Sequence, residues 1–242
     1  MWNEIQGAIR HQLPEFNNYL LKFEKGCVLL DAGYTTDYPT FLKKIEKAGV
    51  KIEDIKYLVL THVHNDHIGY MKDLLENTSI VPILHEEAEG RLLEGKNRLG
   101  DCSGFLSRCL SFLSKVSGKS GETWEPITLD DRKVYANKDN DYLKKQAFPL
   151  TIVELPGHTP DNIGLLTDEG SLFSGDMTIN GFPARHRKTF LIENLEEYKA
   201  SWKKIIDLNP HTIIPCHGKK FPISDMKKYH GKVETIKLWN NK

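Results

Sequence analysis

The sequence contains few cysteines and no long apolar run, and each absence narrows what the protein can be. The four cysteines form no Cys-x-x-Cys pair and are too sparse for a disulfide scaffold, so we expect reduced thiols. No stretch approaches the roughly 20 apolar residues that cross a membrane, and residues 1–16 lack the apolar run of a signal peptide. These absences predict a cytoplasmic protein that makes no contact with a membrane.

An excess of charge of one sign is also missing. The chain has 33 Lys and Arg residues against 33 Asp and Glu residues, and its sequence pI is about 7.1. This balance argues against nucleic acid as the main partner, because a nucleic-acid surface is usually basic. The 242 residues are enough for one large hydrophobic core, and no repeat or linker divides them. We predict a single domain over residues 1–242.

Short apolar runs alternate with helical patterns along the chain, which is typical of a layered α/β domain. The first two runs are joined by Glu24-Lys25-Gly26, a glycine turn that predicts a hairpin. Asn194-Leu195-Glu196-Glu197 has the spacing of a helix capping box. The predicted strands lie at residues 18–23, 27–30, 57–60, 80–84, 150–155, 163–166, 171–173 and 212–214. The predicted helices lie at about residues 37–48, 66–75, 86–94, 105–116, 195–206 and from 224 onward.

Residues 86–148 interrupt this alternation. Two helical patterns and the Gly/Ser-rich stretch 117–121 fall here, and the segment contains no cluster of metal-ligating residues. We interpret it as a helical insertion that packs over one edge of the functional site as a lid and shapes the substrate pocket. A helical excursion without contact to the site is the alternative.

The sequence Thr61-His62-Val63-His64-Asn65-Asp66-His67-Ile68-Gly69 directly follows the strand predicted at 57–60. Residues i and i+2 of an extended chain point the same way, whereas a helix would turn His62 and His64 about 200° apart. We therefore expect both histidine side chains to point to the same side at the strand end, where they can bind one metal ion. Asp66 and His67 follow at the start of the helix predicted at 66–75.

Three further metal-ligating residues follow predicted strands: His158 in Pro-Gly-His-Thr-Pro, Asp176 in Ser-Gly-Asp, and His217 before a glycine. Because α/β sheets build their sites from loops beyond strand ends, these side chains are expected to converge. Five histidines and two aspartates are too many for one tetrahedral zinc, but they suit two metals that share a carboxylate and a water. The candidate ligands are His62, His64, Asp66, His67, His158, Asp176 and His217.

This order of motifs resembles the metallo-β-lactamase superfamily, and the resemblance covers residues 31–217. It implies an αββα sandwich with a dinuclear metal centre. By position, the resemblance implies that His62, His64 and His158 hold the first metal. It implies likewise that Asp66, His67 and His217 hold the second, with Asp176 as the bridge.

The resemblance also bears on the metal. Oxygen-reducing diiron members carry an acid at the position of His64, so the histidine here favours zinc over iron. The lactamases with a cysteine ligand place it where this chain has Asp176, so that subgroup is disfavoured. Asp31 resembles the family's acid that steadies the histidine loop from outside. The implied cofactors are two Zn²⁺ ions, with iron or manganese as alternatives.

The implied activity is metal-dependent hydrolysis. Two metals about 3.5–4 Å apart lower the pKa of a bridging water and supply hydroxide near neutral pH. Asp66 would orient this nucleophile or pass a proton to the leaving group. The expected substrate is a small-molecule thioester, ester or lactone, as in the glyoxalase II and lactonase members. The alternatives are a phosphodiesterase or nuclease on the same metals, an iron-dependent sulfur dioxygenase, or a protein that only binds metal.

Substrate contacts are expected in residues 180–187, which follow Asp176. Arg185 or His186 would meet a substrate carboxylate or phosphate there, and solvated loop charges are the alternative. Only about 25 residues follow His217, so the glutathione-binding C-terminal region of glyoxalase II enzymes is not expected. The sequence leaves open whether the protein forms a homodimer.

Two residues beside the candidate ligands receive no functional role from the sequence. Asp161 follows Pro160 and indicates a turn. Cys216 precedes His217, and we interpret it as a small buried residue rather than a ligand.

Overall fold

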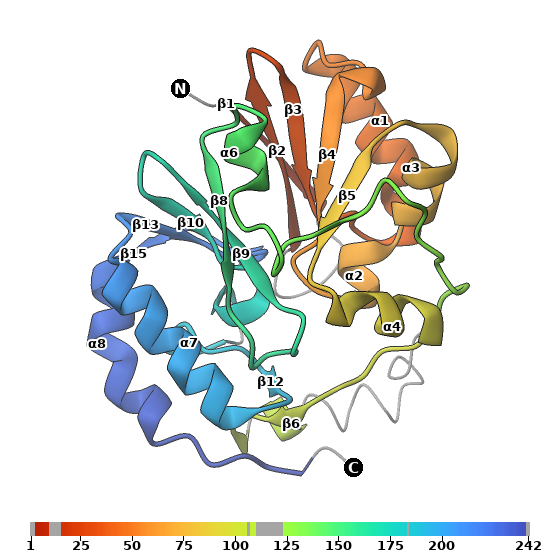
Figure 1. Ribbon diagram of the computed structural model, residues 1–242. Coiled ribbons are helices and arrows are strands. Elements are labelled where there is room, and N and C mark those ends of the chain that lie inside the picture. The colour runs from red at the N-terminus through yellow and green to blue at the C-terminus, as the bar shows by residue number, and fades with distance from the viewer. Residues whose placement is uncertain (1–2, 10–15, 106, 110–122, 183, 241–242) are drawn as a thin grey trace.

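Two β-sheets lie face to face, and helices cover the outer surface of each sheet (Figure 1). The structure is a computed structural model, and it describes residues 3–9, 16–105, 107–109, 123–182 and 184–240. The layers follow the order helix, sheet, sheet, helix. This order confirms the predicted α/β class and the αββα sandwich.

The first sheet has eight strands. They are β1 (Asn3–Ile9), β2 (Phe16–Phe23), β3 (Gly26–Leu30), β4 (Ile55–Val59), β5 (Val81–Leu84), β7 (Val134–Tyr135), β11 (Ile179–Asn180) and β14 (His217–Gly218). Their order is β11-β14-β2-β3-β4-β5-β7, and β1, which the sequence did not predict, also pairs with β2. The neighbours β3, β4, β5 and β7 are parallel, so their carboxyl ends lie at one edge.

The predicted hairpin is confirmed, because β2 and β3 pair antiparallel as far as Phe23 and Gly26. Gly26 has a φ of +132°, which residues with side chains rarely adopt. A Cβ atom there would also lie 2.8 Å from the carbonyl oxygen of Asp54. The turn therefore requires glycine.

The second sheet has five strands in the order β15-β13-β10-β9-β8. They are β8 (Leu150–Glu154), β9 (Ile163–Thr167), β10 (Ser171–Phe173), β13 (Thr212–Ile214) and β15 (Phe221–Pro222). β8 and β10 are both antiparallel to β9, and β13 is parallel to β10. The carboxyl ends of β8, β10 and β13 therefore share one edge of this sheet.

Side chains of the central strands alternate between two cores, as expected for strands that are covered on both faces. Leu20, Leu29 and Leu58 pack toward the helices outside the first sheet. Their sequence neighbours pack between the two sheets, namely Tyr19, Leu21, Val28, Leu30 and Val59. A third core lies between the second sheet and its helices, around the fully buried Trp202.

The longest helices divide between the two outer layers (Figure 1). The longer ones are α1 (Tyr38–Lys47), α7 (Leu195–Leu208) and α8 (Ile223–Glu234), and the short 3₁₀ turns are η1 (Thr35–Asp37), η2 (Ile52–Asp54) and η3 (Gly175–Met177). The predicted cap of α7 is confirmed, since the Asn194 side chain accepts hydrogen bonds from the backbone N–H groups of Glu196 and Glu197. Among the described residues, no helix combines the length and apolarity needed to cross a membrane.

The helix predicted at 66–75 is two helices, α2 (Asn65–Ile68) and α3 (Met71–Asn77). The break has a local cause. The N–H of Gly69 donates to Gly33 O at 2.7 Å, and the N–H of Tyr70 donates to Ala32 O at 2.9 Å. Because these donors bond to the loop after β3, the helical ladder is interrupted between the candidate ligands and α3.

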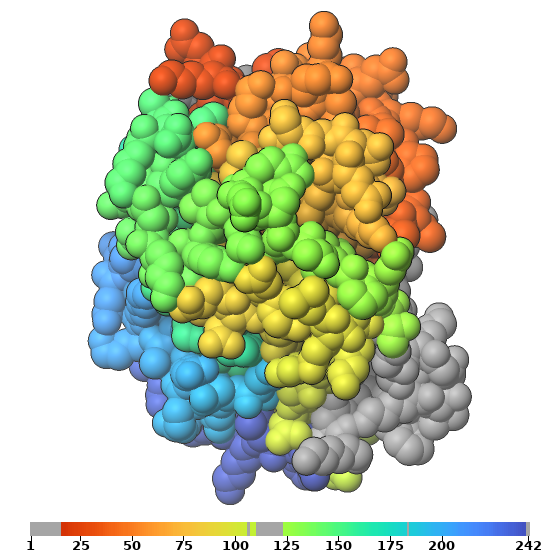
Figure 2. All heavy atoms as spheres, turned by 45° about the vertical axis from the view of Figure 1, so that its right-hand side comes forward, coloured from red at the N-terminus to blue at the C-terminus, as the bar shows by residue number. Residues whose placement is uncertain are grey.

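The segment 86–148 contains more than helices. Its described elements are α4 (Glu87–Glu94), β6 (Asp101–Cys102), β7 and α6 (Tyr142–Lys145). β7 extends the first sheet beside β5, and β6 pairs with β12 (Leu191–Ile192). Figure 2 shows the segment, in yellow and green, on the surface between the orange and blue parts of the chain. The helix predicted at 105–116 and the loop predicted at 117–121 lie mostly outside the described residues.

We predict that Gly69→Ala destabilises the protein. A Cβ at Gly69 would lie 2.2 Å from both Thr35 N and Tyr34 C, which are backbone atoms that cannot move independently. Overpacking of this kind costs about 1–3 kcal/mol or more in the free energy of unfolding. Gly90→Ala in α4 is the control, because its Cβ meets nothing within 4 Å. Urea unfolding of the two metal-free variants checks this, and equal midpoints would contradict it.

Candidate metal centre

The structure brings the seven candidate ligands together at the edge where β4, β8, β10 and β13 end. Two of the resulting groups correspond to the two metal positions expected from the sequence. The first comprises His62, His64 and His158, and the second comprises Asp66, His67 and His217. Both sheets of the sandwich contribute, so the cluster lies where the two layers meet.

Three imidazole nitrogens of the first group point at one another. His62 Nε2 and His64 Nδ1 are 3.0 Å apart, and His158 Nε2 lies 3.2 Å from each of them. All three residues are buried. In a tetrahedral zinc site with Zn–N distances of 2.0–2.1 Å, ligand nitrogens are about 3.3 Å apart. The spacing of the three nitrogens therefore fits one metal ion.

The outward ring nitrogens of two of these histidines donate to backbone carbonyls. His64 Nε2 lies 3.1 Å from Arg98 O, and His158 Nδ1 lies 2.8 Å from Leu191 O. A carbonyl oxygen only accepts, so each outward nitrogen carries the proton and each inward nitrogen carries a lone pair.

Thr61 fixes the third tautomer in the same way. Its hydroxyl donates to Asp31 Oδ2 at 2.9 Å, and it accepts from His62 Nδ1 at 3.0 Å. His62 therefore also presents a lone pair inward. Three lone pairs with no hydrogen between them repel at these distances, and a bound cation is the group that would satisfy all three.

The protonation states agree with this geometry. Burial, followed by the neighbouring His158, lowers the pKa of His64 to about 3. Burial also lowers the pKa values of His62 and His158 below their ordinary value. Neutral imidazole is the form that binds metals, so the first group is ready for a metal near neutral pH.

The second group combines imidazoles with carboxylates. His217 Nε2 lies 3.2 Å from Asp66 Oδ2, and His67 Nε2 lies 3.8 Å from Asp66 Oδ1. Asp176 faces both histidines, at 3.3 Å from His217 Nε2 and 3.7 Å from His67 Nε2. It also groups with His62 and His67, which places it between the two sets of ligands.

Two atoms of this group need a further partner. His67 Nε2 and Asp176 Oδ1 are buried and have no hydrogen-bond partner among the described residues. Buried polar atoms are normally satisfied, and a metal ion between them would satisfy both. The residues present therefore fit a dinuclear centre.

Charge is distributed differently in the second group. Burial alone would lower the pKa values of His67 and His217, but the neighbouring carboxylates raise both above the ordinary value. Burial would raise the pKa of Asp66, but His67 and His217 lower it. The carboxylates thus favour the protonated forms of both histidines, and a bound cation would compete with those protons.

Asp31 is not one of the candidate ligands, but it contacts a ligand of the second group, His67. Its buried carboxylate accepts from Thr61 N at 2.7 Å, from His67 Nδ1 at 2.9 Å and from Cys216 Sγ at 3.2 Å. The contact with His67 fixes which ring nitrogen faces the centre. Cys216 is buried, as the sequence suggested, and it contacts this acid.

The segment 86–148 contacts the centre through the loop after α4. Arg98 O accepts from His64, as described above. The side chain of Asn97 accepts from the N–H of Asn65 at 3.1 Å and donates to Asn65 Oδ1 at 3.0 Å. The alternative in which this segment makes no contact with the site is therefore excluded.

Three residues that the sequence left without a role form a network beside the first group. Asp161, interpreted there only as a turn residue, is fully buried and accepts from Val63 N at 2.8 Å. Arg91 of α4 lies 3.4 Å from Asp161 and also pairs with Glu193 at 2.7 Å. A signal was present in the sequence, because Arg91 shares the apolar helix face of Ala88 and Leu92.

The predicted substrate contacts lie in the loop between β11 and β12. Arg185 is exposed, and the His186 ring packs 5.0 Å from the ring of Tyr229 in α8. Their neighbour Arg187 instead forms an ion pair with Asp225, at 2.7 Å. Arg185 therefore has more freedom than Arg187 to meet a ligand.

Comparison with known proteins identifies relatives in one family. The family model described as "Metallo-beta-lactamase superfamily" matches residues 17–217. The "Beta-lactamase-like protein 2 homolog" of Drosophila melanogaster is 28% identical over 225 residues, which are 88% of this chain and 62% of that protein. The chain thus spans less than two thirds of that relative. "Hydroxyacylglutathione hydrolase GloC" of Haemophilus influenzae is 26% identical, over 85% of this chain and 86% of that protein.

Solved structures share the fold. The archaeal metallo-beta-lactamase superfamily protein ST1585 from Sulfolobus tokodaii superposes with a TM-score of 0.65 at 22% identity, covering 96% of this chain and 85% of that chain. TTHA1623, solved in a di-iron-bound form, gives a TM-score of 0.63 at 21% identity, covering 92% and 97%.

We predict that Asp31→Asn weakens metal binding at the second group. The amide keeps the size of the side chain but loses the charge and an acceptor that hold His67. Loss of such an outer contact typically lowers metal affinity about 10–100-fold. Competition with a chromophoric chelator measures this.

Asp54→Asn is the matched control for Asp31→Asn. Asp54 also accepts from a backbone N–H, that of Lys51 at 3.0 Å, but it lies on an exposed turn. Unchanged affinity in Asp31→Asn, equal to that of Asp54→Asn, would show that Asp31 does not support the ligand.

Proposed function

The chain belongs to the metallo-beta-lactamase superfamily, and from this premise we propose that it hydrolyses a small-molecule thioester, ester or lactone at a dinuclear metal centre. One observation carries the proposal. Three inward-facing imidazole nitrogens lie within 3.2 Å of one another, beside a second group that Asp176 connects to them.

The seven converging residues would hold two metal ions. We assign His62, His64 and His158 to the first ion, Asp66, His67 and His217 to the second, and Asp176 to both. Zinc is the proposed metal, because neutral imidazoles dominate the first group. Iron and manganese are the alternatives that metal analysis distinguishes. When bound, two such ions supply a water of lowered pKa and polarise a substrate oxygen.

Asp66 is the proposed catalytic residue of the chain itself. Its side chain is 17% exposed, against 9% for Asp176 and none for His67, so it is the more open of the two carboxylates. The Tyr34 hydroxyl lies 3.4 Å from Asp66 Oδ2 and restrains it. In this position Asp66 can orient the attacking water and carry a proton to the leaving group.

The substrate proposal rests on the relatives and on the loop 180–187. The similarity to a hydroxyacylglutathione hydrolase supports a thioester, at an identity of 26%. The loop presents Phe182, which is 76% exposed, close in sequence to the exposed Arg185. An acidic substrate with an apolar part matches these side chains, and we propose Arg185 and His186 as its contacts.

Metal analysis and a substrate panel test the function together. We expect two zinc ions per chain and turnover of one carbonyl substrate among a lactoylglutathione-type thioester, a homoserine lactone and a nitrocefin-type lactam. His64→Ala should lower turnover about 100-fold or more, since it removes a ligand of the first metal. His211→Ala, which alters an exposed histidine, should leave it unchanged.

Other outcomes of the panel would overturn the proposal. Turnover of bis-p-nitrophenyl phosphate alone would favour a phosphodiesterase. Iron with sulfur-oxidising activity would favour the dioxygenase, and tight metal binding without any turnover would favour a binding protein.

We predict that Arg185→Ala raises KM for an acidic substrate about tenfold, while kcat and metal content stay unchanged. The loss of one partly exposed charged contact corresponds to about 1.4 kcal/mol. Steady-state kinetics against an acidic and a neutral substrate check this. Lys25→Ala, in the exposed β2–β3 turn, is the control. Equal KM values in all three proteins would remove Arg185 from the substrate site.

A further inference from the structure

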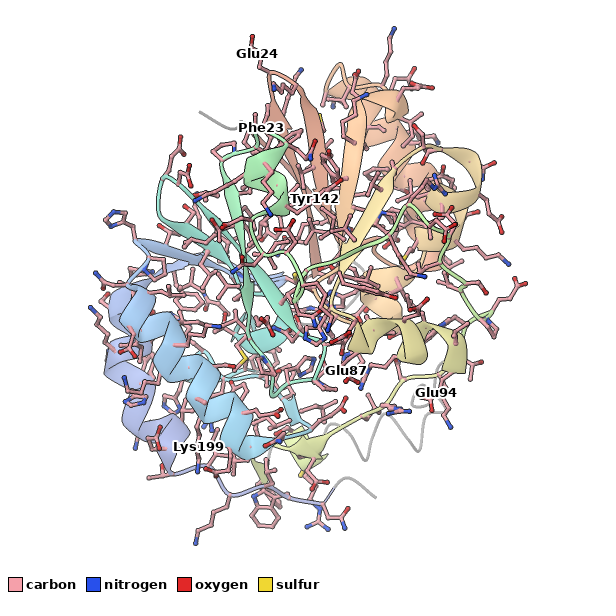
Figure 3. The ribbon with its side chains drawn as sticks, viewed as in Figure 1. Phe23, Glu24, Glu87, Glu94, Tyr142 and Lys199 are labelled. Atoms are coloured by element: carbon pink, nitrogen blue, oxygen red, sulfur yellow. The ribbon has the colours of Figure 1, made fainter. Side chains whose placement is uncertain are left out.

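Arg91 is a buried arginine in a helix that contributes no candidate ligand. Glu87 and Glu94 mark the two ends of this helix, α4, in Figure 3. The Arg91 side chain is only 4% exposed and shares its face with the buried Ala88 and Leu92. A buried guanidinium needs carboxylate partners, and Arg91 has two of them on different loops.

The first partner, Glu193, connects Arg91 to the loop that carries His158. Arg91 binds Glu193 through two parallel contacts, Nη1 to Oε2 at 3.1 Å and Nη2 to Oε1 at 2.7 Å. The backbone N–H of Glu193 donates to Gly157 O at 3.0 Å and to His158 O at 3.2 Å. The bidentate pair thus fixes a residue that contacts the His158 backbone directly.

The second partner, Asp161, lies on the same loop as His158, between β8 and β9, and contacts the loop of His62 and His64. Arg91 Nε and Asp161 Oδ1 form an ion pair at 3.4 Å, without a hydrogen bond between these two atoms. The other oxygen, Oδ2, accepts from the N–H of Val63 at 2.8 Å. Val63 stands between the two histidines in sequence, so Asp161 holds the backbone from which both project.

We propose that Arg91 is a positioning residue for the first metal, because it ties the His62–His64 loop and the His158 loop to one guanidinium group. The two loops follow strands of different sheets, β4 and β8. Asp161 joins the two loops directly through Val63. Arg91 holds Asp161 and Glu193 with one guanidinium and so supports the 3.0–3.2 Å spacing of the three inward nitrogens. The inference rests on the proposed metal centre and adds to it a residue that touches neither metal nor substrate.

The geometry requires arginine rather than any cation. A planar guanidinium reaches two carboxylates on different sides at once, whereas a lysine ammonium has one point of charge on a flexible stem. Arg91→Lys therefore keeps the charge but cannot keep both loops in place.

The test compares metal affinity in four variants of the full chain. Arg91→Met removes both contacts, Arg91→Lys removes the fork, and Glu193→Gln weakens only the His158 arm, with Glu193 22% exposed and thus less critical for folding. Arg132→Met is the control. Arg132 lies in the same segment 86–148, pairs with Asp130 and donates to two backbone carbonyls, but it is remote from the ligand loops in sequence and contacts.

Two measurements distinguish a role of Arg91 in positioning the ligands from a role in the stability of the whole protein. Chelator competition gives the dissociation constants of both metals, and the visible spectrum of the Co²⁺ form reports coordination at the first group. We expect the dissociation constant of the first metal to rise about 10–100-fold in Arg91→Met and Glu193→Gln. In Arg91→Lys it should rise at least as much as in Glu193→Gln. The Co²⁺ spectrum should change in these variants and stay native in Arg132→Met, whatever the shifts in Tm.

Native first-metal affinity and a native Co²⁺ spectrum in Arg91→Lys and Glu193→Gln would overturn the inference. A native protein that binds two metals but hydrolyses nothing would overturn the proposed hydrolase instead, and the affinity comparison would still decide the role of Arg91. A native protein that binds no metal would overturn both.

Discussion

The buried carboxylate of Asp31 joins parts of the chain that the candidate centre needs in one place. It accepts from Thr61 at the end of β4, from His67 in α2 and from Cys216 beyond β13. A buried carboxylate without partners costs several kcal/mol, so the charge and its donors hold one another in position. Asp31 also has a φ of +60°, a conformation that costs about 1–3 kcal/mol for such a residue. The surrounding donors are what keep it there.

The two halves of the centre prepare for a cation in different ways. In the first half, backbone carbonyls and Thr61 direct the histidine protons outward, and the inward nitrogens remain neutral. In the second half, carboxylates raise the pKa values of His67 and His217 and so favour their protonated forms. The first half is therefore organised by geometry and the second by charge. A cation bound in the second half would compete with protons, whereas one bound in the first half would relieve a repulsion between lone pairs.

Much of this arrangement could be predicted from the sequence, because strand patterns and loops beyond strand ends follow general rules. Those rules placed His62, His158 and His217 at one edge without any structure. The break between α2 and α3 could not be predicted in that way, since it depends on carbonyls of the loop at Ala32 and Gly33. The role of Asp161 was missed for the same reason. Its partners lie about 70 and 98 residues earlier in the chain, and only packing of the two sheets brings them near.

The pairing of β14 with β2 brings together parts of the chain that are synthesised far apart in time. His217 lies opposite Phe16, so a candidate ligand late in the sequence pairs with the first residue of β2. Ligands and supports are spread from Asp31 to His217, and no short stretch of the chain contains them all. During synthesis the first sheet has its amino-terminal strands long before the last histidine exists. The full set of ligands therefore forms only when nearly the whole sandwich has closed, and ions that arrive earlier meet an incomplete site.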